Sequence, residues 1–317
     1  MTGPGWVRAL PDGKPISALG FGCSSLWAKP GFDEARAQAV LETAVAEGVN
    51  HFDTSPSYGP ALGEERLGRF IAARGARDLV VSTKVGNNLV DGAIRRGFAL
   101  DDMRRSLDGS LRRLGLDRVD IVYLHGPTVA ELMSDNVARF LAEEKAAGRI
   151  GFAGVESRSP DVIAAAADAP VDAVMPHYNA GNPAMSELFE PLSRTGKFIV
   201  SGTTLAQMAF DLRTFLPTNR RKLWYLLRIA KNDPLFWWRG PRLARALRRS
   251  GKSPHEAAIA FVIANPYVIS GLFGSSNPDH VAANARAGRR SAAEAGNALR
   301  RTVWPGEAIA SSAAAAI

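Results

Sequence analysis

The strongest constraint on the fold of this chain is an alternation between short apolar runs and segments with helical spacing, which repeats eight times. The apolar runs cover residues 19–23, 49–53, 79–84, 119–125, 150–156, 171–176, 197–201 and 268–273. Each run is followed by a segment such as 101–115, in which Met103, Leu107, Leu111 and Leu114 recur at intervals typical of one helix face. The other helical segments are 33–48, 63–73, 134–148, 160–167, 183–195, 254–264 and 278–288.

Repeated strand–helix units predict a parallel sheet, because parallel neighbours must be joined by crossover connections. Eight units in 317 residues favour an α/β fold of the (β/α)8 TIM-barrel type. A doubly wound open sheet is the alternative, but residues 20–23 lack the third glycine and the helix start of a dinucleotide-binding fingerprint. We therefore expect a single barrel domain over 1–317. Two short strands around the turn at 11–13 would form an N-terminal hairpin, and the alanine-rich residues 308–317 a flexible tail.

The cysteine content and the hydropathy pattern predict a cytoplasmic protein. Cys23 is the only cysteine, so no disulfide can form within the chain, which suits a reducing compartment. The first fifteen residues lack the apolar core of a signal peptide. No apolar run approaches the roughly 18 residues of a membrane span.

The positive charge of the chain is concentrated in one long segment after the seventh strand. The chain carries a net charge of +8, whereas residues 206–254 hold twelve basic and two acidic side chains, a net charge of +10. The rest is therefore close to neutral. Three interpretations stay open for this aromatic, basic insertion: basic helices packed on the barrel rim, a lid that selects an anionic or aromatic substrate, or a surface for nucleic acid or an anionic membrane. Because no nucleic-acid motif appears, nucleic acid is not the expected partner.

Four polar residues stand at or just after the ends of neighbouring predicted strands. Asp53, Lys84 and His125 close the second, third and fourth strands, and Tyr58 follows Asp53 in a loop. Active sites of such barrels form at this end, and adjacent strands are only about 4.8 Å apart. A buried lysine must be paired, so we expect an ion pair with Asp53. The ammonium would then lower the pKa of Tyr58, while His125 could bond a substrate oxygen, as carbonyl reduction requires.

These residues lie in motifs that resemble those of the aldo-keto reductases, and the resemblance extends over residues 7–287. The motifs are FDTxxxYG at 52–59, GEExLG at 63–68, STK at 82–84 and LHGP at 124–127. The resemblance implies a barrel plugged by the N-terminal hairpin. It also implies an NAD(P)H-dependent oxidoreductase that acts on an aldehyde, ketone or sugar. The implied catalytic residues are Asp53, Tyr58, Lys84 and His125, with Tyr58 the general acid in reduction and the base in oxidation.

The resemblance further implies where a dinucleotide would bind. The segment from Gly274 to Asn284 is similar to the one that holds the adenosine phosphate, and residues 201–205 resemble the turn over the pyrophosphate. A helix beginning near Pro278 would offer free N–H groups to a phosphate. We expect NADP(H) in preference to NAD(H). The cofactor-binding residues implied are Cys23, Ser24, Asp53, Ser157, Met175, Tyr178, Ser201, Thr203, Leu205, Gly274, Ser275, Ser276, His280 and Asn284.

Near the nicotinamide the chain departs from the family pattern. Glu156-Ser157 replaces the usual Ser-Asn pair, and Met175 stands where Gln is common. Ser157 can still bond the carboxamide, whereas the thioether of Met175 bonds it poorly. Either His177 or Tyr178 could be the aromatic contact after the sixth strand.

The remaining predictions concern substrate, metal and partners. We expect Trp27 to be a wall of the substrate pocket beside Tyr58 and His125, and not a core residue. His51, two residues deeper than Asp53, is expected to be a core histidine. No cluster has metal-ligand spacing, so no metal site is predicted. The expected partner is a small carbonyl or alcohol substrate. A regulatory or interaction protein with little turnover is the alternative function. The oligomeric state is not predicted.

Overall fold

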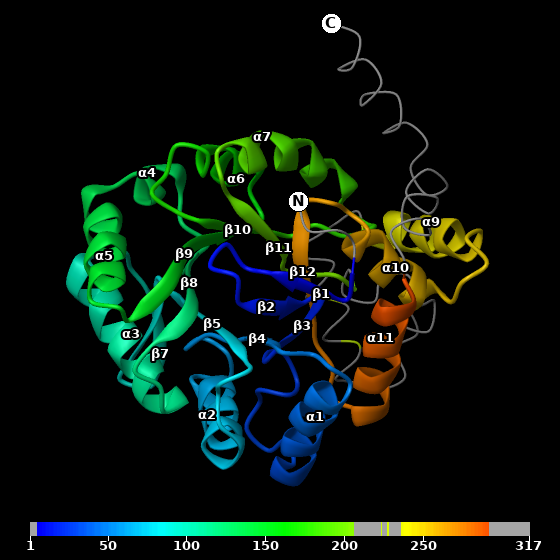
Figure 1. The fold of residues 1–317 in the computed structure, drawn as a ribbon, viewed down its shortest axis with the longest axis horizontal. Helices are drawn as coiled ribbons and strands as arrows, with labels where there is room; N and C mark the ends of the chain where they lie inside the picture. Colours follow the sequence, from blue (N-terminus) through cyan, green and yellow to red (C-terminus); the bar gives the residue numbers. More distant parts are fainter. Residues whose placement is uncertain (1–4, 206–222, 224–226, 228–235, 292–317) are drawn as a thin grey trace, which may run out of the picture.

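Eight parallel strands close into a barrel that the surrounding helices cover (Figure 1). The computed structural model describes residues 5–205, 223, 227 and 236–291. The strands follow one another around the barrel in the order β10-β11-β12-β3-β4-β5-β8-β9. They are β3 (Leu19–Gly22), β4 (His51–Asp53), β5 (Val80–Val85), β8 (Val119–His125), β9 (Ile150–Ser157), β10 (Ala173–Pro176), β11 (Phe198–Ser201) and β12 (Val268–Phe273). The predicted (β/α)8 barrel is confirmed.

Helices follow the strands where the apolar spacing predicts them. They are α1 (Glu34–Ala46), α2 (Leu62–Arg74), α3 (Leu100–Leu114), α4 (Val129–Leu132), α5 (Asp135–Ala146), α6 (Pro160–Ala165), α7 (Phe189–Arg194) after a 3-10 turn η1 (Pro183–Leu188), α9 (Phe236–Arg248), α10 (Pro254–Ile263) and α11 (Pro278–Arg290). Asp33 caps α1 by accepting the backbone N–H of Arg36, and Gly115 ends α3 with a left-handed backbone. The apolar side chains of α3, including Met103 and Leu107, are buried. At these two ends the helix boundary follows local capping chemistry, and the covered face of α3 follows the apolar spacing.

The N-terminal hairpin of β1 (Val7–Ala9) and β2 (Pro15–Ser17) closes the bottom of the barrel, as predicted. Ile16 is fully buried in the barrel interior. Arg8 donates hydrogen bonds to the carbonyls of Ile263 and Val268, and Lys14 forms an ion pair with Asp120 at 2.6 Å. Because Asp120 and Val268 lie at the N-terminal ends of their strands, the hairpin blocks the end opposite the predicted active site.

A second hairpin, β6 (Asn87–Val90) with β7 (Ala93–Arg96), rises from the C-terminal end of β5. It was not predicted from the sequence, although its turn carries the Asp91-Gly92 pair typical of a tight hairpin. Both turn residues have positive φ, 50° and 75°. Arg96 ties it to the segment after β8 by pairing with Glu131 of α4 and by donating to the Gly126 carbonyl of the preceding loop at 3.1 Å. The hairpin therefore stands on the rim beside His125.

The limits of the predicted single domain stay a prediction, since the tail at 308–317 and most of the basic segment 206–254 lie outside the described residues. Within that segment, α9 buries Leu243 and Leu247 and exposes Arg242 and Arg245. Among the described helices, we find none that is both long enough and apolar enough to cross a membrane.

A buried arginine organises the loop at 23–33, which lies between β3 and α1. The Arg66 guanidinium, on α2, has no exposed surface. It donates to the carbonyls of Trp27 and Phe32, the latter at 3.0 Å, and its Nε donates to Glu34 at 2.9 Å. The same loop meets the turn after Tyr58, because the α-carbon of Gly59 lies against the carbonyl of Ala28.

We predict that Gly59→Ala destabilises the protein much more than Gly31→Ala. Both glycines have a left-handed backbone, with φ of 63° and 77°. A Cβ on Gly59 would lie 1.6 Å from the Ala28 carbonyl oxygen, whereas a Cβ on Gly31 meets nothing within 4 Å. Gly31→Ala should cost about 1 kcal/mol, and Gly59→Ala about 3 kcal/mol or more, in the unfolding free energy from urea titration. Equal costs would contradict the close approach.

We also predict that Arg66→Ala lowers the unfolding free energy by about 3 kcal/mol, because it removes the hydrogen-bond donor of the buried Trp27 carbonyl and of the partly buried Phe32 carbonyl. Arg69→Ala is the matched control, since Arg69 pairs with the same Glu34 at 2.6 Å but is 53% exposed. Its loss should cost less than about 1 kcal/mol. The same urea titration measures both variants, and a small effect of Arg66→Ala would mean that water replaces its hydrogen bonds.

Candidate active site

Three neighbouring strands bring Asp53, Lys84 and His125 to one end of the barrel. Asp53 ends β4, His125 ends β8, and Lys84 lies one residue before the end of β5, which pairs with both. The strand register places Asp53 opposite Ser82, so the lysine lies two residues further toward the C-terminal end. The barrel ladder therefore sets the relative heights of these side chains.

The Asp53 carboxylate and the Lys84 ammonium form the ion pair predicted from the sequence. Their side chains are only 3% and 1% exposed. Ser82 donates to the second carboxylate oxygen at 2.8 Å, and Lys84 also donates to the Thr54 carbonyl at 3.0 Å. Burial lowers the pKa of Lys84, but the charge and hydrogen bond of Asp53, together with the charges of Tyr58 and Glu156, outweigh burial and raise this pKa, so the lysine is charged.

The Tyr58 ring lies between Lys84 and His125. The Lys84 Nζ is 5.1 Å from the ring centroid, and the ring meets that of His125 edge-on with centroids 6.2 Å apart. The prediction that Lys84 lowers the Tyr58 pKa is wrong in its net direction. Burial and the charges of Asp53 and Glu156 raise the pKa of Tyr58, and Lys84 lowers it by a smaller amount. The resulting pKa is about 12. The phenol is therefore protonated at neutral pH.

His125 is a neutral side chain with a hydrogen-bonding group at each ring nitrogen. Its Nδ1 lies 3.4 Å from the Ser55 hydroxyl, and its Nε2 lies 3.6 Å from the Glu156 carboxylate. Burial lowers the pKa of His125 to about 4, although Glu156 raises it. His51, by contrast, is fully buried and bonded to the hydroxyl of Ser270 at 3.0 Å, which confirms it as a core histidine.

Glu156 is a charged residue of this site that sequence reasoning missed. It was seen only as a departure from the family pattern, although a glutamate at the end of an apolar strand is itself a signal. One carboxylate oxygen lies 2.6 Å from the His177 Nε2 and the other faces His125. Its charge acts on all four of the implied catalytic residues, Asp53, Tyr58, Lys84 and His125, which we call the tetrad.

A cavity of about 330 Å³ opens beside this cluster, within the size range of small-molecule sites. Its lining includes Asp53 and Tyr58 as well as Gly274 to Ser276. Nine of the residues predicted to bind cofactor or substrate line it: Ser24, Trp27, Asp53, Tyr58, Thr203, Leu205, Gly274, Ser275 and Ser276. Trp27 is only 1% exposed and also belongs to the core, so it is both core residue and pocket wall.

The lining residues fit a dinucleotide. Ser24, Thr203, Ser275 and Ser276 supply hydroxyl groups for phosphate and ribose oxygens, and α11 begins nearby at Pro278. The Thr204 hydroxyl beside this lining is buried without a hydrogen-bond partner. Backbone and hydroxyl donors of this kind suit an anionic diphosphate.

Several predicted cofactor residues do not line the cavity. Tyr178 is fully buried and packs against Phe189 and Phe261, and its hydroxyl accepts a hydrogen bond from Asn265 at 3.3 Å. Tyr178 therefore lies in the helical layer, and of the two aromatic alternatives it is His177 that joins the tetrad through Glu156. The Ser201 hydroxyl donates to the Tyr178 carbonyl at 2.5 Å, and its predicted contact with a cofactor stays a prediction.

Five other predicted cofactor residues are not among the residues that line this cavity. Met175 fills the barrel interior, and Cys23 is fully buried in the core. The Ser157 hydroxyl accepts the backbone N–H of Ser159 at 3.1 Å. On α11, His280 is exposed and Asn284 is buried. The implied contacts of all five with a cofactor stay predictions.

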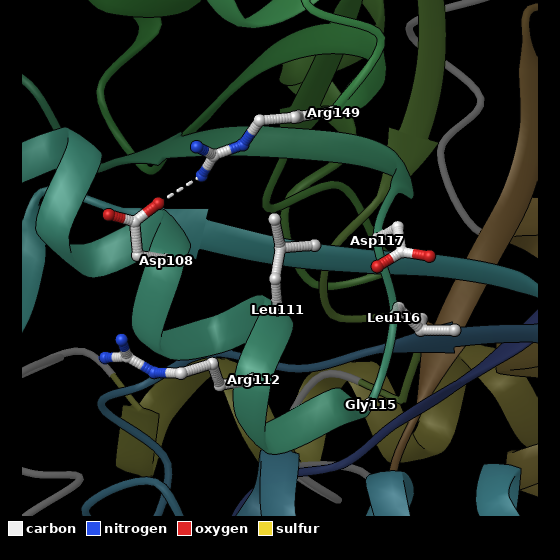
Figure 2. Close-up of a pocket in the computed structure, with 7 residues that line it drawn as sticks. All are labelled: Asp108, Leu111, Arg112, Gly115, Leu116, Asp117 and Arg149. Atoms are coloured by element: carbon white, nitrogen blue, oxygen red, sulfur yellow. Dashed lines mark hydrogen bonds and ion pairs between the residues drawn. The ribbon is translucent and has the colours of Figure 1, made fainter.

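Figure 2 shows another hollow, of about 440 Å³, between the C-terminal end of α3 and the strands β8 and β9. Arg149 and Asp108 form an ion pair across it. Because Asp117 precedes β8 and Arg149 precedes β9, this hollow lies at the opposite end of the barrel from the tetrad. That end stabilises such barrels and does not carry their chemistry.

Known proteins share both the sequence pattern and the fold. Residues 18–295 match the model of the Aldo/keto reductase family. A D-threo-aldose 1-dehydrogenase of a Pseudomonas species is 30% identical, with 87% of this chain and 91% of the relative covered. An L-galactose dehydrogenase of Arabidopsis thaliana is 28% identical, with 89% and 87% covered.

A solved structure, the holo form of an aldo-keto reductase of Bacillus halodurans, superposes with a TM-score of 0.76 at 25% identity. It covers 93% of this chain, and 95% of its own length is matched. The family uses a nicotinamide dinucleotide to transfer hydride to carbonyl groups. The chain belongs to the aldo-keto reductase family and is an oxidoreductase.

Proposed function

We propose that this chain interconverts the carbonyl and alcohol groups of a sugar or small aldehyde, with Tyr58 exchanging the proton and NADP(H) as the preferred cofactor. The observation that carries the proposal is the position of Tyr58. Its phenol lines the cavity and lies between the buried Lys84–Asp53 pair and His125. The sugar dehydrogenases among the relatives support a sugar as the substrate.

The side chains of the tetrad divide the proton chemistry among them. When bound, the dinucleotide supplies or accepts the hydride. In reduction the carbonyl oxygen becomes a hydroxyl, and the protonated phenol of Tyr58 donates the proton to that oxygen. The Lys84 ammonium and a His125 N–H stabilise negative charge that develops on the oxygen. Oxidation runs the same proton back to Tyr58.

The proposed cofactor preference depends on few groups. Thr203 and Ser24 would bond the pyrophosphate, and Ser275, Ser276 and the N-terminus of α11 would hold the adenosine end. His280 stands exposed in the first turn of α11, within the segment proposed to meet a 2′-phosphate. The buried, unpaired Cys23 is compatible with the reducing cytoplasm that we propose as its compartment.

We predict that the purified protein oxidises or reduces neutral and phosphorylated sugars or small aldehydes, and that Tyr58→Phe lowers kcat/KM by about 10²–10⁴-fold. Absorbance of the reduced nicotinamide measures turnover with NADPH and NADH, and fluorescence titration compares their Kd values. Removing a single hydroxyl leaves the ring packing in place, so cofactor binding should persist. Absence of turnover, or an unchanged rate in the variant, would reject the proposal. Tighter binding of NADH would reject only the preference for NADP(H).

The raised pKa of Tyr58 gives a second prediction. Since the phenol is protonated up to about pH 12 in the resting protein, an ultraviolet difference titration against Tyr58→Phe should show its phenolate appearing well above the ordinary value of about 10. Reduction, which needs the protonated phenol, should therefore lose no activity through titration of Tyr58 between pH 7 and about 10. A phenolate that forms near neutral pH would mean that Lys84 outweighs burial.

A further inference from the structure

We propose that Glu156 is a positioning residue for His125. Its carboxylate, anchored on His177, keeps the single proton of the neutral His125 ring on Nε2. This inference rests on the proposed function, because that N–H is the group that can donate to the oxygen of a carbonyl substrate.

Three adjacent strands hold the three side chains together. His125 and Glu156 are direct register partners on β8 and β9, and Met175 of β10 is the partner of Glu156 on the other side. His177 follows β10 directly. The Glu156 side chain is 11% exposed, and the two imidazoles are 19% and 18% exposed. The carboxylate is therefore placed between two rings by the barrel itself.

The chemistry of the carboxylate decides where the protons are. An ionised carboxylate only accepts hydrogen bonds, so a ring nitrogen that is hydrogen-bonded to it must carry hydrogen, and its charge favours hydrogen on a nitrogen that faces it at longer distance. Burial alone would raise the pKa of Glu156, but the His177 hydrogen bond and the charges around it lower this pKa to about 2. Glu156 is ionised in the pH range where His125 is neutral. The Nε2 of His177, at hydrogen-bond distance, therefore carries a proton, and the negative charge 3.6 Å from the Nε2 of His125 favours a proton there as well.

The other face of His125 agrees with this assignment. A neutral imidazole with hydrogen on Nε2 has a bare Nδ1, which needs a donor. The Ser55 hydroxyl lies 3.4 Å from Nδ1 and also contacts the Ser57 hydroxyl at 2.8 Å. Ser55 can accept from the Ser57 backbone N–H at 3.2 Å and still turn its proton toward His125. The Ser55 contact is thus compatible with hydrogen on Nε2, the tautomer that the Glu156 carboxylate favours.

The two contacts of Glu156 differ in length, which gives the two histidines different roles. The contact to His177 is a hydrogen bond of 2.6 Å, whereas the His125 Nε2 is 3.6 Å away, beyond ordinary hydrogen-bond length. His177 therefore anchors the carboxylate, and the N–H of His125 stays available to a substrate oxygen. The reversed tautomer would present a lone pair to that oxygen and repel it.

Histidine NMR on the resting protein tests the tautomer without substrate or cofactor. The chain has five histidines, and His125→Gln and His177→Gln assign the two signals of interest. In the wild type we expect hydrogen on Nε2 of both rings. In Glu156→Gln the amide carbonyl can accept from one ring only and should stay on the shorter contact to His177. Its NH₂ then faces His125, whose proton should move to Nδ1.

Glu156→Asp keeps the charge and should keep the His125 proton on Nε2, which also serves if Glu156→Gln folds poorly. A wild-type His125 protonated on Nδ1 would overturn the proposal. So would a Glu156→Gln protein in which His125 is unchanged.

Kinetics then separate positioning from a general structural effect. Glu156→Gln should lower kcat/KM by about tenfold or more, as expected when a group that orients a catalytic imidazole is removed. Glu156→Asp should restore part of this loss. Glu144→Gln is the matched control, because Glu144 is also a buried carboxylate but lies on α5 in the outer layer. It should change kcat/KM by less than about twofold.

A double-mutant comparison measures whether the effect of Glu156 passes through His125. In a His125→Gln background, Glu156→Gln should change kcat/KM by less than about twofold, because its effect passes through the missing ring. A full further loss would overturn the proposal. If the wild type shows no turnover while the tautomer still shifts in Glu156→Gln, the proposed function fails and the assignment of the proton to Nε2 remains.

Discussion

The active site depends on the buried ion pair between Asp53 and Lys84. An isolated charge at this depth would cost many kcal/mol, and removing one partner of such a pair typically costs about 3–5 kcal/mol. The pair is tolerated because Ser82 and the Thr54 carbonyl satisfy the remaining polar atoms. The ladder between β4 and β5 sets the geometry of the ion pair, because Asp53 is the register partner of Ser82 and Lys84 lies two residues further along β5. The closed sheet is thus what allows a permanent positive charge beneath the Tyr58 ring.

The charges around Tyr58 help to explain why its phenol is protonated in the resting protein. One ammonium faces two carboxylates, since Glu156 adds a second negative charge to that of Asp53. Burial and these charges together outweigh Lys84, so the phenol keeps its proton at neutral pH. Glu156 is held in this charged state by His177. The same carboxylate therefore acts on both proton-bearing groups of the site: it holds a proton on His125 and disfavours the loss of one from Tyr58.

Local patterns in the sequence were sufficient for the barrel and for the strand-end residues of the tetrad. Apolar periodicity located the eight strands, and a lysine at a buried strand end required a carboxylate, which Asp53 provides. The direction of the Tyr58 pKa shift could not be obtained this way, because it is a balance among burial, Lys84 and two carboxylates that only coordinates can weigh. The buried position of Tyr178 could not be predicted, for a related reason. Its phenol found a partner in Asn265, some ninety residues away in the chain.

Tyr58 differs from the rest of the tetrad because no strand holds it. Its position depends on the contact between two loops. Gly59 lies against the carbonyl of Ala28, and Arg66 holds the loop of Ala28 by donating hydrogen bonds to its backbone carbonyls. Contact of this kind leaves no room for a side chain at residue 59, which is why a left-handed glycine follows the tyrosine. The strands therefore set the charges of the site, and the packing of two loops sets the distance over which the proton must move.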